Sequence, residues 1–231
     1  TIDDNTTGLI TPLNITDTFG AINSLALNSS GTLSRAEAAG GVITVDGNFA
    51  ANSMDMTDVN NLAKLVINGA AGADTIIGAR LDDTITGGTD NDILYGGLGN
   101  DKFVTTDIET NGVDKIFSFT SNADGASVNE GADKFQFSTA DLKNATGFVA
   151  YTGSDTALTL TGGDKVQYVT GGGASASTNQ ATFIYDTSSG SLSFDADGTG
   201  ANSAISLALV YSDSGSTELT DLLVADFAFI A

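Results

Sequence analysis

Hydrophobic residues recur at every ninth position through the middle of the chain. Residues 69–104 divide into four consecutive nonapeptides, GAAGADTII, GARLDDTIT, GGTDNDILY and GGLGNDKFV. Each has one large apolar residue two places after an Asp, and these apolar residues are Ile76, Ile85, Leu94 and Phe103. A fixed period over consecutive segments is typical of repeat architectures. The pattern predicts short strands with this residue pointing inward, separated by tight turns in which glycine accepts a positive φ.

The Asp positions of the repeats predict metal binding. If two nonapeptides complete one coil, Asp74 lies over Asp92 and Asp83 lies over Asp101. Stacked carboxylates about 5 Å apart repel each other by about 3 kcal/mol at an effective dielectric near 20. Two carboxylates together with turn carbonyls supply the oxygen ligands that Ca²⁺ prefers, and filling such a site is coupled to folding. We expect the carbonyl oxygens to come from Gly69, Ala71, Gly72, Gly78, Arg80, Gly87, Thr89, Asp90, Gly96, Leu98 and Gly99.

Two other interpretations of the repeats remain open. A flexible linker can also be rich in Gly and Asp, although a linker has no reason to keep an apolar residue at every ninth position. A roll that has lost its metal sites is also compatible with the sequence, because template glycines are replaced by Ala70, Ala79, Leu81 and Asp90.

The flanking segments read mainly as strands. Apolar residues at 42–45, 53–57 and 62–67 predict metal-free coils over 42–68 that continue or cap the roll, because an open strand edge needs cover. Residues 34–39 and 218–225 are predicted to be short helices. Alternation predicts hairpins pairing 157–161 with 165–169 and 182–186 with 191–195, followed by a strand at 205–211.

The composition excludes several kinds of chemistry. The 231 residues carry 8 basic and 29 acidic side chains, a net charge of −21, and contain no His or Cys. Without these two residue types there is no disulfide, no Cys- or His-ligated zinc and no Ser-His-Asp triad. The strong negative charge argues against nucleic acid and anionic membranes, and no apolar run is long enough to span a bilayer. The chain begins at Thr1 rather than Met, so we expect it to be part of a longer protein.

The nonapeptides resemble the RTX, or repeats-in-toxin, family of bacterial proteins exported by type I secretion. Segments 111–119, 130–137, 192–201 and 219–227 are similar to segments that follow the repeats in that family. The resemblance implies a parallel β-roll with Ca²⁺ between its turns, and an uncleaved export signal at the C-terminus. It also suggests that Asp114 completes the lowest calcium site.

One further candidate lies outside the repeats. Asp195 and Asp197, in Asp-Ala-Asp-Gly-Thr-Gly, could begin a metal-binding loop. The EF-hand pattern requires an oxygen ligand such as Asp or Asn at position five and Glu at position twelve, where this chain has Thr199 and Ser206. An Asx-rich turn between strands is the alternative.

We therefore expect an all-β chain with a right-handed parallel β-roll, N-terminal capping coils and a C-terminal antiparallel part. The expected divisions are 1–68 for the capping region, 69–119 for the calcium roll and 120–231 for the C-terminal region with the export signal. The expected partners are calcium ions, the secretion machinery during export, and cell-surface polysaccharide or further copies of the chain.

The sequence favours a non-catalytic, secreted or cell-surface protein. The expected function is a module that folds on extracellular Ca²⁺ and carries the export signal of a structural surface protein, such as an S-layer protein or an adhesin. The alternative is the C-terminal folding and export domain of a secreted enzyme such as a protease or a lipase. Residues 1–60 are rich in Thr, Asn and Ala and poor in basic residues, which favours the structural role.

Overall fold

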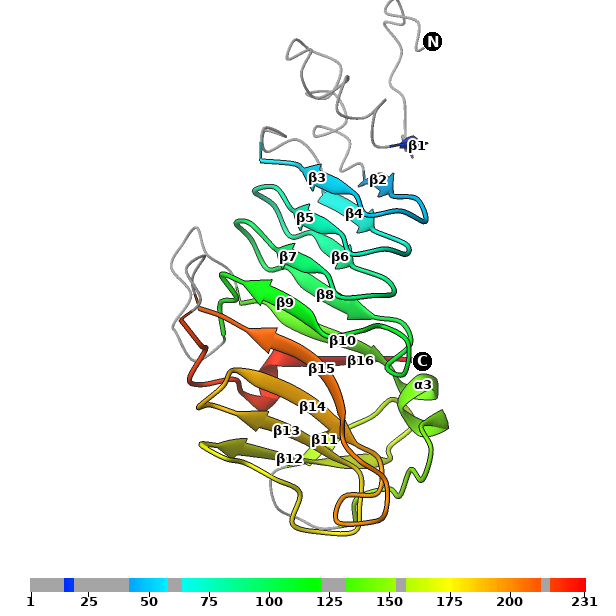
Figure 1. Cartoon of the computed structure of the whole chain (residues 1–231), viewed down its shortest axis with the longest axis vertical. Helices are drawn as coiled ribbons and strands as arrows, with labels where there is room; N and C mark the ends of the chain where they lie inside the picture. Colours follow the sequence, from blue (N-terminus) through cyan, green and yellow to red (C-terminus); the bar gives the residue numbers. More distant parts are fainter. Residues whose placement is uncertain (1–14, 19–41, 58–63, 122–131, 153–156, 213–216) are drawn as a thin grey trace, which may run out of the picture.

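The computed structural model shows a stack of short strands that forms two sheets (Figure 1). It describes residues 15–18, 42–57, 64–121, 132–152, 157–212 and 217–231. One sheet has seven strands in the order β1-β2-β4-β6-β8-β10-β16, and the other has nine in the order β11-β12-β13-β14-β15-β9-β7-β5-β3. Because consecutive strands of the roll alternate between the sheets, two strands and two turns make one coil.

The seven-stranded sheet is parallel throughout. Its register follows the repeats, since Ile67, Ile85 and Phe103 are consecutive partners on β4, β6 and β8. Strand β16 pairs with β10 and is the last strand at this edge of the sheet among the described residues. The strands are β1 (Ile15–Thr18), β2 (Val42–Asp46), β4 (Lys64–Asn68), β6 (Thr84–Thr86), β8 (Lys102–Thr105), β10 (Lys134–Ser138) and β16 (Phe227–Ile230).

The nine-stranded sheet changes character along its length. From β3 to β15 its pairs are parallel, with Met54, Ile76, Leu94 and Ile116 in one row. Beyond β15 it is mixed, because β14 and β13 are antiparallel neighbours whereas β12 and β13 are parallel. The strands are β3 (Ser53–Asp55), β5 (Thr75–Ile77), β7 (Ile93–Tyr95), β9 (Asp114–Phe117), β11 (Ala157–Thr159), β12 (Lys165–Gly171), β13 (Thr182–Asp186), β14 (Ser191–Asp195) and β15 (Ile205–Val210).

The core lies between the two sheets and is continuous from the roll into the C-terminal region. Each repeat strand buries its central residue, and Ile76 and Ile85 are fully inaccessible to solvent. Below the repeats the core becomes aromatic, with Phe119 and Phe135 stacked at 4.9 Å and Phe183 packed 5.2 Å from Phe227. The described C-terminal strands are thus packed onto the lower coils of the roll.

The all-β architecture and the β-roll are confirmed, with differences in the C-terminal part. Both expected hairpins form, as β11–β12 and β13–β14, and β15 matches the expected strand at 205–211. The C-terminal part is not purely antiparallel, because β10, β15 and β16 extend the roll in parallel and β12 is parallel to β13. Nothing in the structure separates residues 69–119 as a unit, and those divisions stay predictions.

The helices differ from those predicted. The predicted helix at 218–225 is wrong: Glu218 forms an isolated bridge to Tyr211, and only the 3₁₀ turn η2 (Val224–Asp226) follows. A helix that was not predicted, α3 (Thr139–Asn144), follows β10 and is capped by the Ser138 side chain. The predicted helix at 34–39 lies outside the described residues.

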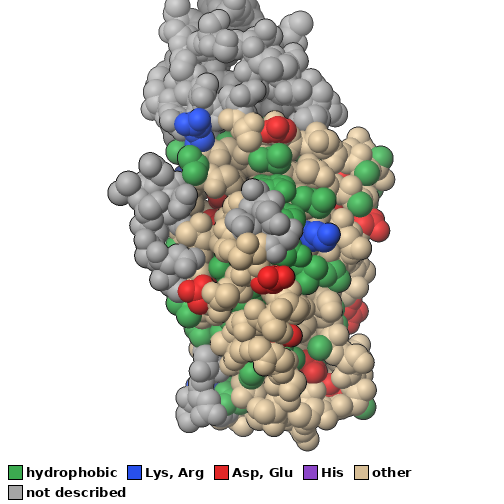
Figure 2. Space-filling model, turned by 60° about the vertical axis from the view of Figure 1, so that its left-hand side comes forward, with side chains coloured by type: hydrophobic (Ala, Val, Ile, Leu, Met, Phe, Trp, Pro, Cys, Tyr) green, Lys and Arg blue, Asp and Glu red, His purple; other side chains and the backbone are tan. Residues whose placement is uncertain are grey.

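The surface agrees with the charge of the sequence. Acidic side chains are scattered over the face shown in Figure 2, and basic groups are sparse there. Among the described residues, two ion pairs form, Lys64 with Asp82 and Lys143 with Asp164. The acidic side chains of the repeat positions are absent from this outer surface, because they are buried.

Candidate calcium sites

Six buried Asp side chains stand in two columns along the edges of the roll. Each lies directly before or at the start of a strand, and each is at most 6% exposed. We call Asp74, Asp92 and Asp114, at β5, β7 and β9, the first column. We call Asp83, Asp101 and Asp133, at β6, β8 and β10, the second column. The predicted stacking of Asp74 over Asp92 and of Asp83 over Asp101 is therefore present.

Hydrogen bonds link the members of the first column. The Asp74 main-chain N–H donates to Oδ1 of Asp92 at 2.8 Å, and the Asp92 N–H donates to Oδ1 of Asp114 at 3.0 Å. At the top, the Asn52 N–H donates to Oδ1 of Asp74 at 2.6 Å. At the bottom, the Asn111 side-chain amide donates to Oδ2 of Asp114 at 2.8 Å. One oxygen of each carboxylate therefore fixes the position of the coil above it.

The second column repeats this arrangement. The Leu65 N–H donates to Oδ1 of Asp83 at 2.8 Å, and the Asp83 N–H donates to Oδ1 of Asp101 at 2.8 Å. The Asp101 N–H in turn donates to Oδ1 of Asp133 at 2.9 Å, and Oδ2 of Asp133 accepts from the Thr120 N–H at 2.9 Å. The same Oδ1 contact thus recurs in every coil.

The second oxygen distinguishes three of the six carboxylates. Oδ2 of Asp74, Asp92 and Asp101 is buried and has no hydrogen-bond partner. A buried, unpaired carboxylate oxygen is costly, so a cation or a proton must compensate it. In the other three carboxylates Oδ2 is hydrogen-bonded. It accepts from the Asn111 side-chain amide in Asp114, from the Thr120 N–H in Asp133, and from the Ala79 N–H at 2.7 Å in Asp83.

Glycines make room for the unpaired oxygens. A Cβ added at Gly69 would lie 2.4 Å from Oδ2 of Asp74 and 2.3 Å from the Gly87 carbonyl oxygen. At Gly87 and Gly96 the corresponding Cβ would lie 2.2 Å and 2.3 Å from Oδ2 of Asp92 and Asp101. A side chain is therefore excluded at the first position of each of these turns, and at Gly69 a carboxylate oxygen and a carbonyl oxygen approach the same point. This donor set fits Ca²⁺, which takes oxygen ligands of both kinds.

The turns that carry the expected carbonyl ligands stack on one another. Ala71 and Thr89 form a parallel bridge between successive turns, and the Leu98 N–H donates to the Ala79 carbonyl at 3.0 Å. Gly72 and Gly99 have positive φ angles, as the turn requires, whereas Gly69, Gly78, Gly87 and Gly96 do not. Arg80 and Leu98 are exposed residues. Asp90 keeps the positive φ of the glycine it replaces, and its Oδ2 accepts from the Gly72 N–H at 3.1 Å.

The electrostatics of the columns reflect their burial. Burial raises the pKa of Asp101 to about 8 and that of Asp83 and Asp92 to about 6, with repulsion from neighbouring carboxylates adding to it. Burial likewise raises the pKa of Asp114 and Asp133 to about 7, and it also raises the pKa of Asp74. Among the described residues no three acidic side chains cluster closely enough to hold a metal ion by themselves. Main-chain carbonyls are therefore needed to complete any site.

Two residues of this arrangement were not predicted from the sequence. Asp133 extends the second column, although it follows Asp101 by 32 residues rather than 18. Asn52 takes the Asp position at the top of the first column, below a turn that begins at Gly47. Their signal is a buried apolar residue two places later, Phe135 and Met54 respectively. Asp114, predicted from family resemblance, lies in the first column, and Asp195 and Asp197 lie away from both columns.

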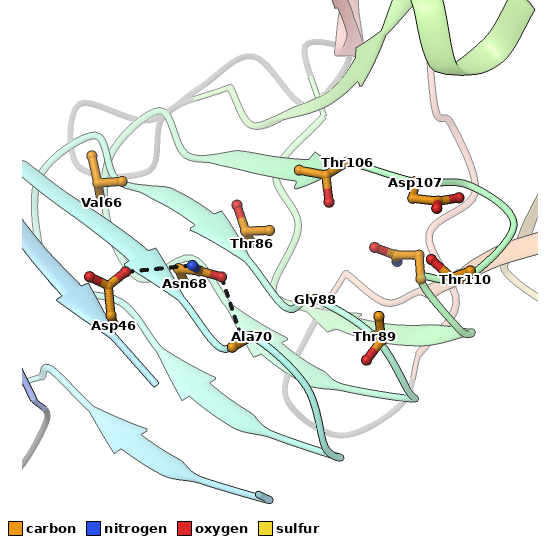
Figure 3. Close-up of a pocket in the computed structure, with 11 residues that line it drawn as sticks. Asp46, Val66, Asn68, Ala70, Thr86, Gly88, Thr89, Thr106, Asp107 and Thr110 are labelled. Carbon is orange, nitrogen blue, oxygen red and sulfur yellow. Dashed lines mark hydrogen bonds between the residues drawn. The ribbon is translucent and has the colours of Figure 1, made fainter. Parts of the chain in front are cut away.

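A groove of about 390 Å³ runs over the outer face of the seven-stranded sheet, beside the turns of the first column. Figure 3 shows Asp46, Asn68 and Thr86 in a row across β2, β4 and β6, with Thr106 and Asp107 farther along. The Asn68 side chain contacts both the Asp46 carboxylate at 3.5 Å and the Ala70 N–H at 3.2 Å. The row therefore connects the ends of β2, β4 and β6 to the turn that precedes Asp74.

Comparison with protein families agrees with this geometry. Residues 68–103 match the RTX calcium-binding nonapeptide repeat in four copies. This segment is an RTX calcium-binding repeat. Ca²⁺ is thus the metal of the RTX turns, and the repeat is a calcium-binding rather than a catalytic one. No curated protein matches the chain. Within the part of the chain that the structure describes, no helix is both long and apolar enough to cross a membrane.

Proposed function

We propose that this chain is a calcium-dependent folding module of a secreted structural surface protein, and that it carries that protein's type I export signal. The observation that supports the folding role is the set of buried, unpaired Oδ2 atoms of Asp74, Asp92 and Asp101. These carboxylates disfavour the closed roll until a cation binds. Binding of Ca²⁺ then becomes folding free energy, because the ligands come together only in the folded coils.

This coupling suits export. In cytosol poor in Ca²⁺ the acidic chain stays unfolded, and an unfolded chain can be threaded through a channel. Outside the cell, millimolar Ca²⁺ fills the turns and the roll closes. The net charge of −21 adds general repulsion that opposes premature collapse.

The folding role is tested by circular dichroism of the full chain. In EDTA the β-sheet signal is expected to be lost, and Ca²⁺ in the millimolar range is expected to restore it. Na⁺ at matched ionic strength serves as the control, because it screens repulsion but, with a single charge, binds a site with carboxylate ligands far more weakly than Ca²⁺. A sheet signal that persists in protein shown by mass spectrometry to be metal-free would exclude the coupling.

The structural role on the cell surface rests on the composition of residues 1–60, which are rich in Thr, Asn and Ala. Its test is the location of the full-length protein in cells that express it. Immunolabelling is expected to cover the cell surface, and the label is expected to leave the cells when EDTA is added. Protein found only in the medium, joined to a catalytic domain, would favour the enzyme alternative.

The export signal is proposed within residues 180–231, which contain no Lys or Arg and end on an apolar segment. This region also supplies β13, β14, β15 and β16, so its removal disrupts the fold as well as the signal. Secretion of the chain without residues 180–231 should therefore be compared with that of Phe137→Ala. Phe137 is 1% exposed in the core, and its truncation destabilises the fold while leaving the tail intact.

A signal in the tail predicts that Phe137→Ala is secreted and that the truncated chain is not. The mass of the secreted protein is expected to include the tail. Secretion of the truncated chain, or a mature form from which the tail has been removed, would contradict the proposal.

A further inference from the structure

The turn after β14 brings together two carboxylates far from the nonapeptide columns. Asp195 is the last residue of β14 and Asp197 follows in the turn. Asp195 is 6% exposed, and Oδ1 of both side chains is buried without a hydrogen-bond partner. Outside the two columns, these are the only buried unpaired side-chain oxygens among the described residues.

The two carboxylates face each other. Burial raises the pKa of Asp195, and the nearby Asp197 carboxylate, within hydrogen-bonding reach, raises it further. Oδ2 of Asp197 is held by the Asn202 side-chain amide at 2.8 Å and by the Asn202 main-chain N–H at 3.2 Å. The position of Asp197 is thus fixed, and its unpaired Oδ1 remains available to a ligand.

Main-chain oxygens from a second loop approach the same turn. Gly198 has a φ of +64°, and a Cβ added there would lie 1.9 Å from the Thr178 carbonyl oxygen and 2.7 Å from that of Gln180. The Thr199 N–H donates to the Thr178 carbonyl at 2.8 Å, which leaves that oxygen a second lone pair. Two carbonyl oxygens of the loop before β13 therefore lie against this turn.

No positive side chain compensates this pair. The ion pairs of the described residues lie elsewhere, at Lys64–Asp82 and Lys143–Asp164. The sequence from residue 166 to residue 231 contains no Lys or Arg. Asp195 is buried and Asp197 is partly buried. A buried carboxylate that faces a second one without a cationic neighbour is stabilised by a shared proton or by a bound metal ion.

We propose that Asp195 and Asp197 bind a calcium ion outside the repeats, with the Thr178 carbonyl as a further ligand. The oxygen-only donor set and the presence of two carboxylates favour a hard divalent cation. The ion links the loop before β13 to the end of β14. It thereby stabilises the C-terminal sheet independently of the nonapeptide turns.

The experiment counts calcium ions bound to the full chain. Wild type is compared with the double variant Asp195→Asn/Asp197→Asn and with the control Asp164→Asn/Glu218→Gln. The control removes two acidic groups that lie outside the turn, the exposed Glu218 and the partly exposed Asp164, which pairs with Lys143. After equilibrium dialysis against CaCl₂, elemental mass spectrometry gives the number of ions per chain.

The double variant is expected to bind one ion fewer than wild type, and the control the same number as wild type. An unchanged count in the double variant overturns the proposal. If the double variant fails to fold by circular dichroism, wild-type crystals grown with Sr²⁺ decide the question. An anomalous peak between Asp195 and Asp197 supports the site, and peaks confined to the repeat turns overturn it in favour of a shared proton. Because the result is the difference between two total counts, the ions bound in the repeats cancel, and the result does not depend on the proposed function.

Discussion

At the scale of single residues, the two oxygens of each column carboxylate have different roles. Oδ1 accepts the same main-chain hydrogen bond in every coil and so sets the register between coils. Oδ2 is unpaired only at Asp74, Asp92 and Asp101. The second repeat differs because Ala79 does not adopt the positive φ seen at Ala70, Gly88 and Gly97. Its N–H instead closes onto the carboxylate of Asp83.

This difference predicts unequal effects of two chemically identical substitutions. Asp92→Asn removes the negative charge of a carboxylate that has an unpaired oxygen. We expect the calcium affinity to fall at least about tenfold, which corresponds to a loss of ~1.4 kcal/mol in binding free energy. Asp83→Asn alters a carboxylate whose oxygens are both hydrogen-bonded, and we expect a smaller change in calcium affinity. Isothermal titration calorimetry of the two variants measures the difference. Equal weakening in both would show that the second turn also holds an ion.

A second prediction concerns backbone strain in the first repeat. Ala70 has a φ of 80° where the template has Gly. A positive φ costs conformational free energy in a residue that carries a Cβ, whereas Gly adopts it freely. We expect Ala70→Gly to raise the free energy of unfolding by about 1 kcal/mol in saturating Ca²⁺. The matched control is Ala71→Gly. Ala71 does not have a positive φ, so this substitution should lower the stability through the added flexibility of the unfolded chain. Urea denaturation gives both values, and destabilisation by Ala70→Gly would contradict the argument.

The candidate site could be predicted from sequence as far as the nonapeptide period extends. Asp74, Asp83, Asp92 and Asp101 were found because residue spacing and vertical stacking coincide there. Asp133 and Asn52 join the same columns through longer connections, and a fixed period of nine cannot detect them. Likewise, sequence could not distinguish Asp83 from its neighbours, because the φ of Ala79 depends on the packing of adjacent coils.

At the scale of elements, local alternation predicted strands better than helices. The hairpins β11–β12 and β13–β14 form because their turns and their apolar alternation agree. The helix predicted at 218–225 does not form. Leu219 and Leu222 are each 1% exposed, and the Leu219 N–H donates to the Val210 carbonyl at 3.1 Å. Tertiary pairing at the end of β15 thus overrides the local helix propensity of this segment.

The protonation of the carboxyl groups in the two columns makes the stability of the fold depend on pH. A carboxyl group whose pKa is higher in the folded than in the unfolded state stabilises the fold at low pH, and this contribution is lost as the pH rises through the folded pKa. Burial raises the pKa of Asp101 to about 8 and that of Asp114 and Asp133 to about 7, all from 3.8. Since the unfolded pKa is 3.8, this stability is lost between about pH 4 and about pH 8, which is the relevant window.

We expect the two metal states to respond to pH with opposite signs. In EDTA, any residual folded population should decrease as the pH rises through this window, because the buried carboxyl groups lose their protons. In limiting Ca²⁺ stability should increase, because calcium ligands must be deprotonated and protons compete with the ion. Circular dichroism at fixed temperature, in a buffer series of constant ionic strength, measures both trends. Parallel trends in the two conditions would contradict the competition.

At the scale of the whole molecule, the roll and the C-terminal sheet share their strands. The last coil of the roll pairs with the C-terminal region on both sides, through β9 with β15 and β10 with β16 (Figure 1). Aromatic rings continue the core across this junction, from Phe103 and Phe119 to Phe135 and Phe227. Calcium bound in the repeats should therefore stabilise residues well outside them.

Two buried tyrosines make this coupling measurable. The Tyr168 hydroxyl donates to the Leu222 carbonyl and the Tyr185 hydroxyl to the Leu219 carbonyl, both at 2.5 Å in the C-terminal region. We expect their near-ultraviolet circular dichroism to appear at the same calcium concentration as the far-ultraviolet sheet signal. Asp92→Asn, which lies in the repeats, should move both midpoints to higher calcium by the same factor. If the near-ultraviolet signal keeps its wild-type midpoint in this variant, the C-terminal sheet folds independently of the repeats, with only the calcium ion proposed at Asp195 and Asp197. A shared shift would mean that the continuous strands and core transmit calcium binding through the whole chain, because Asp92 touches neither tyrosine.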